Sequence, residues 1–276
     1  IFKSRKQLNL LEQTRTFSFL KKNKPDVVII AAAKVGGIQA NNTLRAEFLY
    51  QNLQIQNNLI HGSFLANVKK VIFLGSSCIY PKYCKQPIKE DYLLNGKLEE
   101  TNEPYAIAKI AGLKMIENYK NQYGKSYISL MPCNLYGPND NYDLLNSHFL
   151  PALIKKIHLA KIHKQPYIEV WGDGSPKREM MHVDDLSSAC LFFLNKNTNN
   201  SLINIGSGYE KTIKFYVKKL CNILKYNGDI IFNKNMPNGT PRKLLDSSLA
   251  KSYGWRPQIN FDVGLRSTYQ DYLKSY

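Results

Sequence analysis

Short apolar runs that alternate with helix-length periodic segments are the feature that most constrains this chain. The runs at 27–33 and 68–74 are rich in β-branched residues and bounded by turn residues, as buried parallel strands are. A helical pattern precedes the first run up to about Lys22, and a longer one at 46–65 separates the two runs. Strands joined by helices predict a mostly parallel sheet with helices on both faces.

The same rhythm continues to Pro138 and then loosens. The further elements expected along the chain are helices at 103–123, 147–161 and 183–194, and strands at 127–131, 167–171 and 202–206. We therefore expect an α/β fold whose Rossmann-type, doubly wound domain comprises 1–138 and 180–207. A smaller α/β lobe that binds the substrate is expected from 139–179 and 208–276.

Composition narrows the class of protein. The chain has 276 residues, 43% of them apolar, and no unbroken apolar run of the roughly 18 residues that a membrane span needs. Its five cysteines are odd in number and lack CxxC spacing. We expect a soluble protein of the reducing cytoplasm, with no structural zinc or other metal and no membrane partner.

The formal net charge of +17 comes mainly from lysines spread along the chain. A solvated surface explains such a distribution, and the positive field also attracts anionic ligands such as diphosphates. The sequence has no zinc-finger, RNP-type or basic-zipper pattern, so no nucleic-acid partner is expected.

Tyr105 and Lys109 lie four residues apart inside the helix expected at 103–123, which places both side chains on one helical face. A nearby ammonium group stabilises a phenolate and lowers the pKa of the phenol. Chance also produces this spacing in many helices, so the pair alone leaves a purely structural role open.

Ser76 and Cys78 follow the strand expected at 68–74, at the edge of the sheet where ligands of parallel α/β proteins bind. The hydroxyl of Ser76 could hold a substrate carbonyl while Tyr105 delivers a proton to its oxygen. Residues two apart on an extended backbone point the same way, so Cys78 could face the same substrate. A merely buried Cys78 is the alternative.

These features together resemble a known enzyme family. Ser76, the pair Tyr105 and Lys109, and the turn at 134–138 resemble the extended short-chain dehydrogenases/reductases that act on nucleotide sugars. Longer stretches resemble the GDP-L-fucose synthases of that family, namely AAAKVGGIQANNT (31–43), FLGSSCIYPK (73–82), TNEPYAIAKIAG (101–112), NSHFLPALI (146–154) and NGTPRKLLD (238–246). The resemblance implies NADPH-dependent conversion of GDP-4-keto-6-deoxy-D-mannose to GDP-L-fucose, by a homodimer.

The resemblance also implies a role for each residue. Cys78 would be the base and His148 the acid of 3,5-epimerisation, while Ser76 and Tyr105 steady the oxyanion. Tyr105 would then protonate O4 during reduction, and Lys109 would tune the phenol and hold the nicotinamide ribose. His148 or the charge of the oxidised cofactor would help to form the Cys78 thiolate.

Two other functions stay open. Another nucleotide-sugar epimerase or dehydratase is the first, although a dehydratase would be expected to carry an acidic pair after Ser76, and 77–80 has none. A non-catalytic relative that binds nucleic acid through its positive charge is the second.

Basic residues near the start of the chain favour NADP(H). If Ile1 and Phe2 end the second Rossmann strand, Arg5 suits the 2′-phosphate of NADP, where NAD would need an acidic residue. Ala32 and Ala33 would line the cofactor, and a generic basic loop is the alternative reading of Arg5. The sequence has no glycine-rich turn for the pyrophosphate, so we expect a preceding βα unit of roughly 30 residues, without which NADPH binds poorly.

The nucleotide end of the substrate needs cations for its two phosphates. By resemblance Arg178 is the diphosphate ligand, because a guanidinium meets phosphate oxygens in a bidentate fork. Lys156 and Lys243 would assist, although the family usually has an arginine near Lys156. Asn134 and Trp171 are further candidates for the pocket and could equally be turn or core residues.

Overall fold

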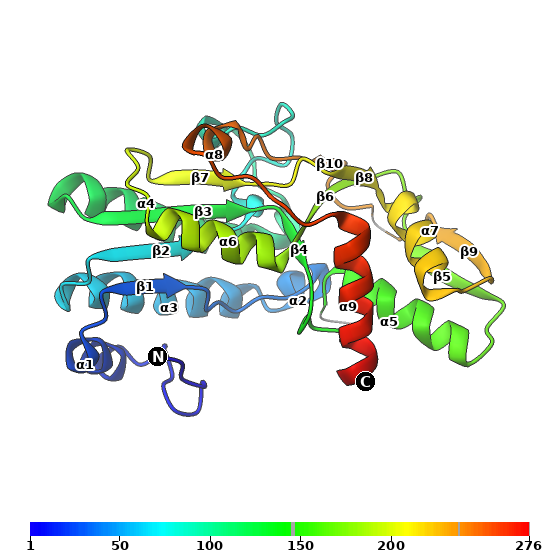
Figure 1. Cartoon of the computed structure of the whole chain (residues 1–276), viewed down its shortest axis with the longest axis horizontal. Coiled ribbons are helices and arrows are strands. Elements are labelled where there is room, and N and C mark those ends of the chain that lie inside the picture. Colours follow the sequence, from blue (N-terminus) through cyan, green and yellow to red (C-terminus); the bar gives the residue numbers. More distant parts are fainter. Residues whose placement is uncertain (145–146, 237, 276) are drawn as a thin grey trace.

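The computed structural model describes residues 1–144, 147–236 and 238–275 (Figure 1). Four parallel strands form the main sheet in the order β1–β2–β3–β7. Their bounds are Val27–Ile30 for β1, Lys70–Leu74 for β2, Ser126–Pro132 for β3 and Leu202–Ile205 for β7. The expected Rossmann-type α/β fold is confirmed.

Helices cover both faces of this sheet (Figure 1). One face carries α1 (Gln13–Asn23), α3 (Arg45–Leu65) and α4 (Glu103–Tyr123), and the other carries α6 (Val183–Leu194). Because side chains alternate along a strand, Phe73 of β2 packs with Ile116 of α4, whereas Ile72 packs in the cluster that contains Phe193 of α6. This alternation explains why the strands read as continuous apolar runs.

The helix that carries Tyr105 and Lys109 has clear start and stop signals. Pro104 lies in its first turn, where its missing N–H costs no hydrogen bond. Gly124 ends it in the left-handed conformation, with φ of 62°. These signals fix α4 in register, so its first two turns lie beside the carboxyl end of β2.

A second lobe has its own core and lies to the right in Figure 1. Its sheets comprise β4 (Asn134–Tyr136), β6 (Lys177–His182) and β10 (Arg242–Lys243) with antiparallel β8 (Glu210–Thr212), and the pair β5 (Tyr167–Trp171) and β9 (Asp229–Asn233). Its helices are α5 (Phe149–Ile162), α7 (Ile213–Leu224) and α9 (Phe261–Ser275). Apolar side chains such as Ile157, Leu220 and Leu265 are fully buried between these layers.

Short elements complete the chain. They are α2 (Ile38–Thr43), α8 (Ser248–Tyr253) and the 3₁₀ turns η1 (Ser77–Ile79), η2 (Glu90–Tyr92) and η3 (Glu100–Asn102). Two expectations need correction: the strand expected at 27–33 ends at Ile30, and Ile1 and Phe2 form no strand but are 79% and 99% exposed. Among the described residues β1 pairs with β2 alone, so no partner strand lies beside Ile1 and Phe2.

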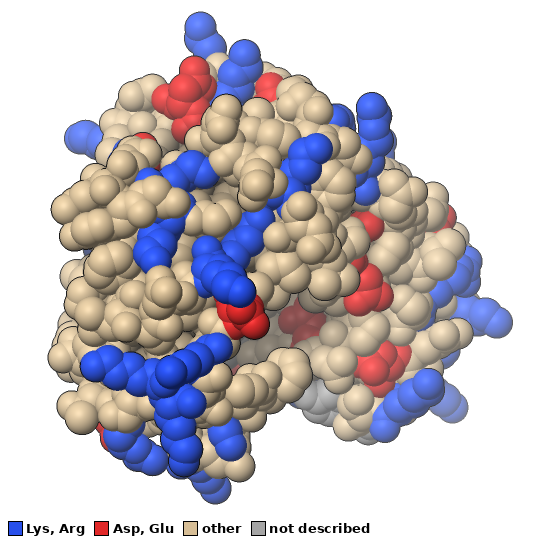
Figure 2. Space-filling view, turned by 60° about the vertical axis from the view of Figure 1, so that its left-hand side comes forward, with Lys and Arg blue, Asp and Glu red and all other residues tan. Residues whose placement is uncertain are grey.

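Surface charge and hydropathy agree with the composition. Lys and Arg side chains are spread across the face shown in Figure 2, with fewer Asp and Glu among them. No helix in the described ranges is long and apolar enough to cross a membrane. Within those same ranges, no group of three or more His, Cys, Asp or Glu side chains could hold a metal ion.

Candidate active site

A cleft of about 860 Å³ lies between the carboxyl ends of the main sheet and the second lobe. It brings together most of the predicted catalytic and substrate residues, namely Ser76, Tyr105, Asn134, His148, Lys156, Trp171, Arg178 and Lys243. Lys109 and Cys78 lie behind its wall, 3% and 5% exposed. Segments far apart in the sequence therefore meet where a parallel sheet binds its ligands.

Cys78 lies beside Ser76, but the backbone conformation between them differs from the expected one. The chain is not extended here but turns into η1, and the hydroxyl oxygen of Ser76 accepts a hydrogen bond from the N–H of Cys78 at 3.4 Å. Extended spacing was thus the wrong reason for placing the two side chains together. The turn itself brings Cys78 beside Ser76, whose hydroxyl also acts on the thiol and lowers its pKa.

The cations near Cys78 also differ from those expected. Burial raises the pKa of the Cys78 thiol, and the positive charge of Lys243 is the largest effect that opposes it, with a smaller contribution from Lys109. His148 is not among the charges that act on the thiol. Lys243, predicted to serve the diphosphate alone, is therefore also the main cation available to a Cys78 thiolate.

Lys109 packs against the rings of Phe73 on β2 and Tyr105 on its own helix. Its Nζ donates a hydrogen bond to the carbonyl oxygen of Leu74 at 2.9 Å and lies 4.7 Å from the ring centroid of Phe73 and 5.8 Å from that of Tyr105. Burial lowers the pKa of Lys109 to about 8. The ammonium group thus donates one N–H to the last residue of β2 and lies near the phenol ring of Tyr105.

The pKa of the Tyr105 phenol is raised, whereas the sequence predicted that Lys109 would lower it. Burial raises its pKa, the negative charge of a Cys78 thiolate raises it further, and Lys109 does not bring it down. Tyr105 therefore keeps its proton near neutral pH. A protonated phenol at the edge of the cleft is a proton donor, which is the form that carbonyl reduction needs.

His148 precedes the first turn of α5 and lies at the mouth of the cleft, open to solvent. The surrounding cleft walls lower the pKa of its imidazole, and the carboxylate of Asp140 opposes that shift. Asp140 was not singled out from the sequence, where its place in the turn after β4 was the one available signal. Burial is the larger of the two effects, so the imidazole loses its proton more readily than a free histidine does.

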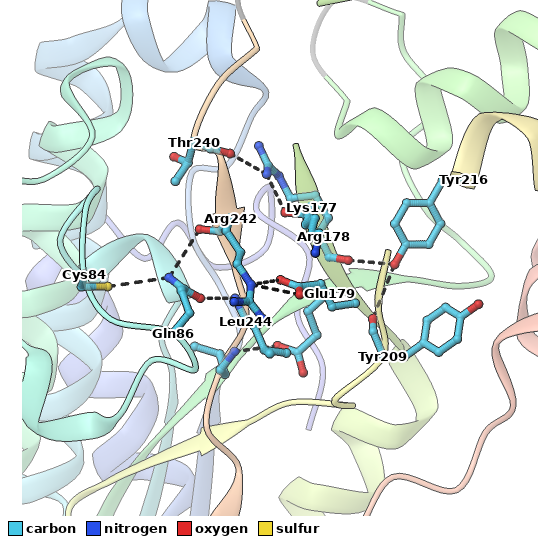
Figure 3. Close-up of polar contacts among 12 residues, drawn as sticks. Cys84, Gln86, Lys177, Arg178, Glu179, Tyr209, Tyr216, Thr240, Arg242 and Leu244 are labelled. Carbon is cyan, nitrogen blue, oxygen red and sulfur yellow. Dashed lines mark hydrogen bonds and ion pairs between the residues drawn. The ribbon is translucent and has the colours of Figure 1, made fainter. Parts of the chain in front are cut away.

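Arg178 and Lys243 are paired across neighbouring strands, because β10 runs parallel to β6 with Lys243 opposite Arg178. One guanidinium nitrogen, Nη1, donates to the carbonyl oxygens of Thr240 at 2.6 Å and Lys177 at 2.8 Å (Figure 3). These two acceptors fix the orientation of the guanidinium group. Thr240 is a further functional residue that the sequence did not reveal.

The other predicted substrate residues surround this pair. Lys156 donates from Nζ to the carbonyl oxygen of Glu169 at 2.8 Å, and burial lowers the pKa of its ammonium group. Trp171 ends β5 with 49% of its surface exposed, and Asn134 begins β4. The cleft therefore combines cations, an amide and an indole face, which are groups that bind a nucleotide.

A second cavity, of about 750 Å³, lies along β1 and the residues that follow it, and the predicted residues Arg5, Ala32 and Ala33 line it. These residues fit a phosphorylated dinucleotide, since an exposed guanidinium group suits a phosphate and single-carbon side chains allow close approach to the strand end. Lys109, with Leu74 as its one hydrogen-bond acceptor in the described part of the chain, keeps N–H groups for a ribose.

Comparison with known proteins decides the family. The model of the NAD dependent epimerase/dehydratase family matches residues 3–206. The chain belongs to the epimerase/dehydratase family.

Within the epimerase/dehydratase family the chain is 49% identical over 275 residues to GDP-L-fucose synthase of Sinorhizobium fredii, covering 100% of this chain and 88% of that protein. It is 50% identical over 275 residues to GDP-L-fucose synthase 1 of Arabidopsis thaliana, covering 100% and 85%. A solved structure, MlghC, the GDP-mannoheptose C4 reductase from Campylobacter jejuni with NADP bound, matches with a TM-score of 0.90 and 37% identity over 99% of this chain and 89% of that one. The resemblance to GDP-L-fucose synthases is confirmed.

Proposed function

We propose that this protein is an NADP-dependent oxidoreductase with epimerase activity that converts GDP-4-keto-6-deoxy-D-mannose to GDP-L-fucose. The sugar is first epimerised at C3 and C5, and its C4 ketone is then reduced with NADPH. One observation carries the proposal: the cleft holds Ser76, Tyr105 and His148 together with the cation pair Arg178 and Lys243, and the buried Cys78 lies in the turn that follows Ser76.

Epimerisation uses the acidity that the C4 ketone gives to the protons on C3 and C5. Cys78 removes each proton as a thiolate, which the charge of Lys243 stabilises. His148 returns a proton to the opposite face, and Asp140 helps it to hold that proton. The hydroxyl of Ser76 donates to O4 and so stabilises the enolate oxyanion.

Reduction needs a proton for O4 and a fixed cofactor. NADPH, when bound, supplies the hydride to C4. Tyr105 donates the proton, since burial keeps its phenol protonated. Lys109 directs its remaining N–H groups to the nicotinamide ribose, Arg5 binds the 2′-phosphate, and the stretch that contains Ala32 and Ala33 lies against the cofactor.

The GDP portion binds through the second lobe. Arg178 and Lys243 take the diphosphate, and Lys156 adds a third cation on α5. Asn134 and Trp171 contact the sugar and the base. The lobe that follows Pro138 therefore supplies most of the recognition and the proposed acid His148, while the first domain supplies the other catalytic residues. We place the division between the two near Pro138.

The test is NADPH consumption with GDP-4-keto-6-deoxy-D-mannose, with the stereochemistry of the product read by NMR. We expect stoichiometric NADPH oxidation and GDP-L-fucose as product. A folded, NADPH-binding protein that leaves this sugar untouched would refute the assignment.

A second substrate class is tested in the same assay, because a solved relative with 37% identity is a GDP-mannoheptose C4 reductase. A 4-keto GDP-heptose would enter through the same cations and be reduced by the same phenol. Faster turnover of the heptose than of the deoxymannose would move the assignment to it, or to another nucleotide-sugar epimerase of the family.

The proposal includes a homodimer and a cytoplasmic location. The neighbouring helices α3 and α4 expose Tyr50, Ile107 and Tyr123, which supports a contact with a second copy through this face. Light scattering should give twice the mass of the chain. None of the five cysteines forms a disulfide, which supports a reducing compartment.

A further inference from the structure

A buried carboxylate lies next to Arg178 and has no part in the chemistry described so far. Glu179 follows Arg178 on β6 and therefore points to the opposite face of the strand, away from the cleft. It is 1% exposed, and burial raises its pKa to about 7. No ion pair joins it to a cation within the described ranges.

Backbone N–H groups satisfy both oxygens of this carboxylate. Oε1 accepts from Gly208 at 2.7 Å, and Oε2 accepts from Leu245 at 2.9 Å. The backbone comes so close that a Cβ atom on Gly206 would lie 2.5 Å from Oε1. A buried acid costs stability unless its oxygens are satisfied, and here each oxygen accepts one backbone hydrogen bond.

Glu179 holds the segment at 240–246, which we term the cation strap. The strap carries Lys243 into the cleft, and its Thr240 carbonyl orients Arg178 at 2.6 Å. The strap is bonded to Glu179 through the N–H of Leu245, which donates to Oε2. Both cations expected at the diphosphate therefore depend on where this one segment lies.

Other contacts hold the strap from its far side. Gln86 accepts from the N–H of Leu244 at 2.9 Å, and the N–H of Ile88 donates to the carbonyl oxygen of Leu244 at 2.7 Å. Figure 3 shows Gln86 and Glu179 on opposite sides of the strap, on either side of Arg242 and Leu244. On the side of β6, Glu179 holds the end of the strap at Leu245, beyond the pairing of β10 with β6 and the ion pair of Arg242 with Glu210.

We propose that Glu179 is a positioning residue for the diphosphate of the substrate: it fixes the cation strap and thereby sets the places of Lys243 and Arg178. The inference rests on the proposed function of the cleft. Only a carboxylate offers an acceptor oxygen to both N–H groups, because the amide of a glutamine would turn its NH₂ group toward one of them.

The test compares Glu179→Gln with Asp185→Asn. Asp185 is a matched control because it is also a buried carboxylate, 3% exposed, that accepts two backbone N–H groups, from Gln258 at 2.8 Å and Ile259 at 3.2 Å. Neither of those partners lines the cleft. Each variant of the full protein is titrated with GDP by calorimetry and assayed for kcat and KM.

We expect Glu179→Gln to weaken GDP binding by about tenfold, as the loss of one buried hydrogen bond predicts, and to raise the KM of the GDP-sugar by a similar factor. Its affinity for NADPH should stay within about twofold of the wild type, whereas deuterium exchange into the sugar should slow, because a displaced Lys243 also stabilises the Cys78 thiolate less. Asp185→Asn should lower the melting temperature while it leaves GDP affinity unchanged. GDP binding requires no turnover, so this result stands even if the sugar is not the one proposed.

Two results would overturn the proposal: unchanged GDP affinity in Glu179→Gln, or equal weakening in Asp185→Asn. If Glu179→Gln does not fold, Glu179→Asp takes its place. The shorter side chain keeps both oxygens but withdraws them from the strap, so GDP should bind more weakly to this variant than to the wild type. Wild-type affinity in Glu179→Asp would equally contradict the proposal.

Discussion

At the scale of single residues, Cys78 and Tyr105 divide the two proposed reactions between them. Burial favours the neutral form of both, but Lys243 opposes that effect at the thiol and no cation opposes it at the phenol. We expect Cys78→Ser to abolish deuterium exchange from solvent into the sugar and to leave residual ketone reduction. Tyr105→Phe should slow hydride transfer by about 10²–10⁴-fold and leave the exchange. NMR of the sugar and NADPH absorbance measure the two steps, and the reverse pattern would overturn the assignment.

The sequence predicted those residues whose placement depends on local structure. Tyr105 and Lys109 follow from helical spacing, and Ser76 from the end of a strand. The effect of Lys243 on Cys78 could not be predicted, because it depends on contacts between segments more than 150 positions apart. Glu179 is the one carboxylate of β6, between Arg178 and Met180, and its two backbone donors lie on distant segments that the sequence does not bring together.

At the scale of elements, the close approach of α4 to α3 and β2 places Lys109. Gly112 makes this approach possible, because a Cβ atom there would lie 2.7 Å from both Gln56 Oε1 and Phe73 Cζ. We expect Gly112→Ala to cost about 1–3 kcal/mol of unfolding free energy and to lower kcat, since Phe73 also packs against the ammonium group of Lys109. Urea unfolding and steady-state kinetics measure the two effects.

Gly124, on the same helix, supplies the control. Its φ is 62° and nothing lies within 4 Å of an added Cβ atom, so Gly124→Ala should cost about 1 kcal/mol through backbone strain and leave kcat unchanged. An effect of Gly124→Ala on kcat, or none of Gly112→Ala, would contradict this account of how α4 is placed.

Long periodic elements could be predicted from the sequence, and short ones could not. The limits of α4, β5 and α6 agree with the expected ones because caps and apolar periodicity mark them. The two-residue strand β10 and the turn η1 carry no such pattern, since their conformation depends on pairing with distant segments. The strand pairing that would place Ile1 and Phe2 is likewise not a local property.

At the scale of the whole molecule, Glu179 links stability to pH. Its folded pKa of about 7 lies above the reference value of 4.5, mainly through burial and to a lesser degree through the charge of Glu210. The folded state therefore binds this proton more tightly than the unfolded state. Between pH 4.5 and about 7 unfolding releases the proton, so the free energy of unfolding falls as the pH rises through this range. The 2.5-unit difference corresponds to about 3 kcal/mol.

Urea unfolding of the wild type and Glu179→Gln at pH 5 and pH 8 should measure this linkage. The difference in unfolding free energy between the two proteins should shift in favour of the glutamine variant at the higher pH, because the variant has no carboxyl group to ionise. A difference that is the same at both pH values would contradict the assigned pKa.

The cation strap has a mechanical consequence. It is bonded on one side to Ile88, which packs in the core of the first domain, and on the other to β6 of the second lobe. The strap therefore connects the two halves beside the cleft, and they cannot separate at this point without breaking its hydrogen bonds. A movement of the second lobe away from Ile88 would therefore displace Thr240 and Lys243, the strap residues that line the cleft.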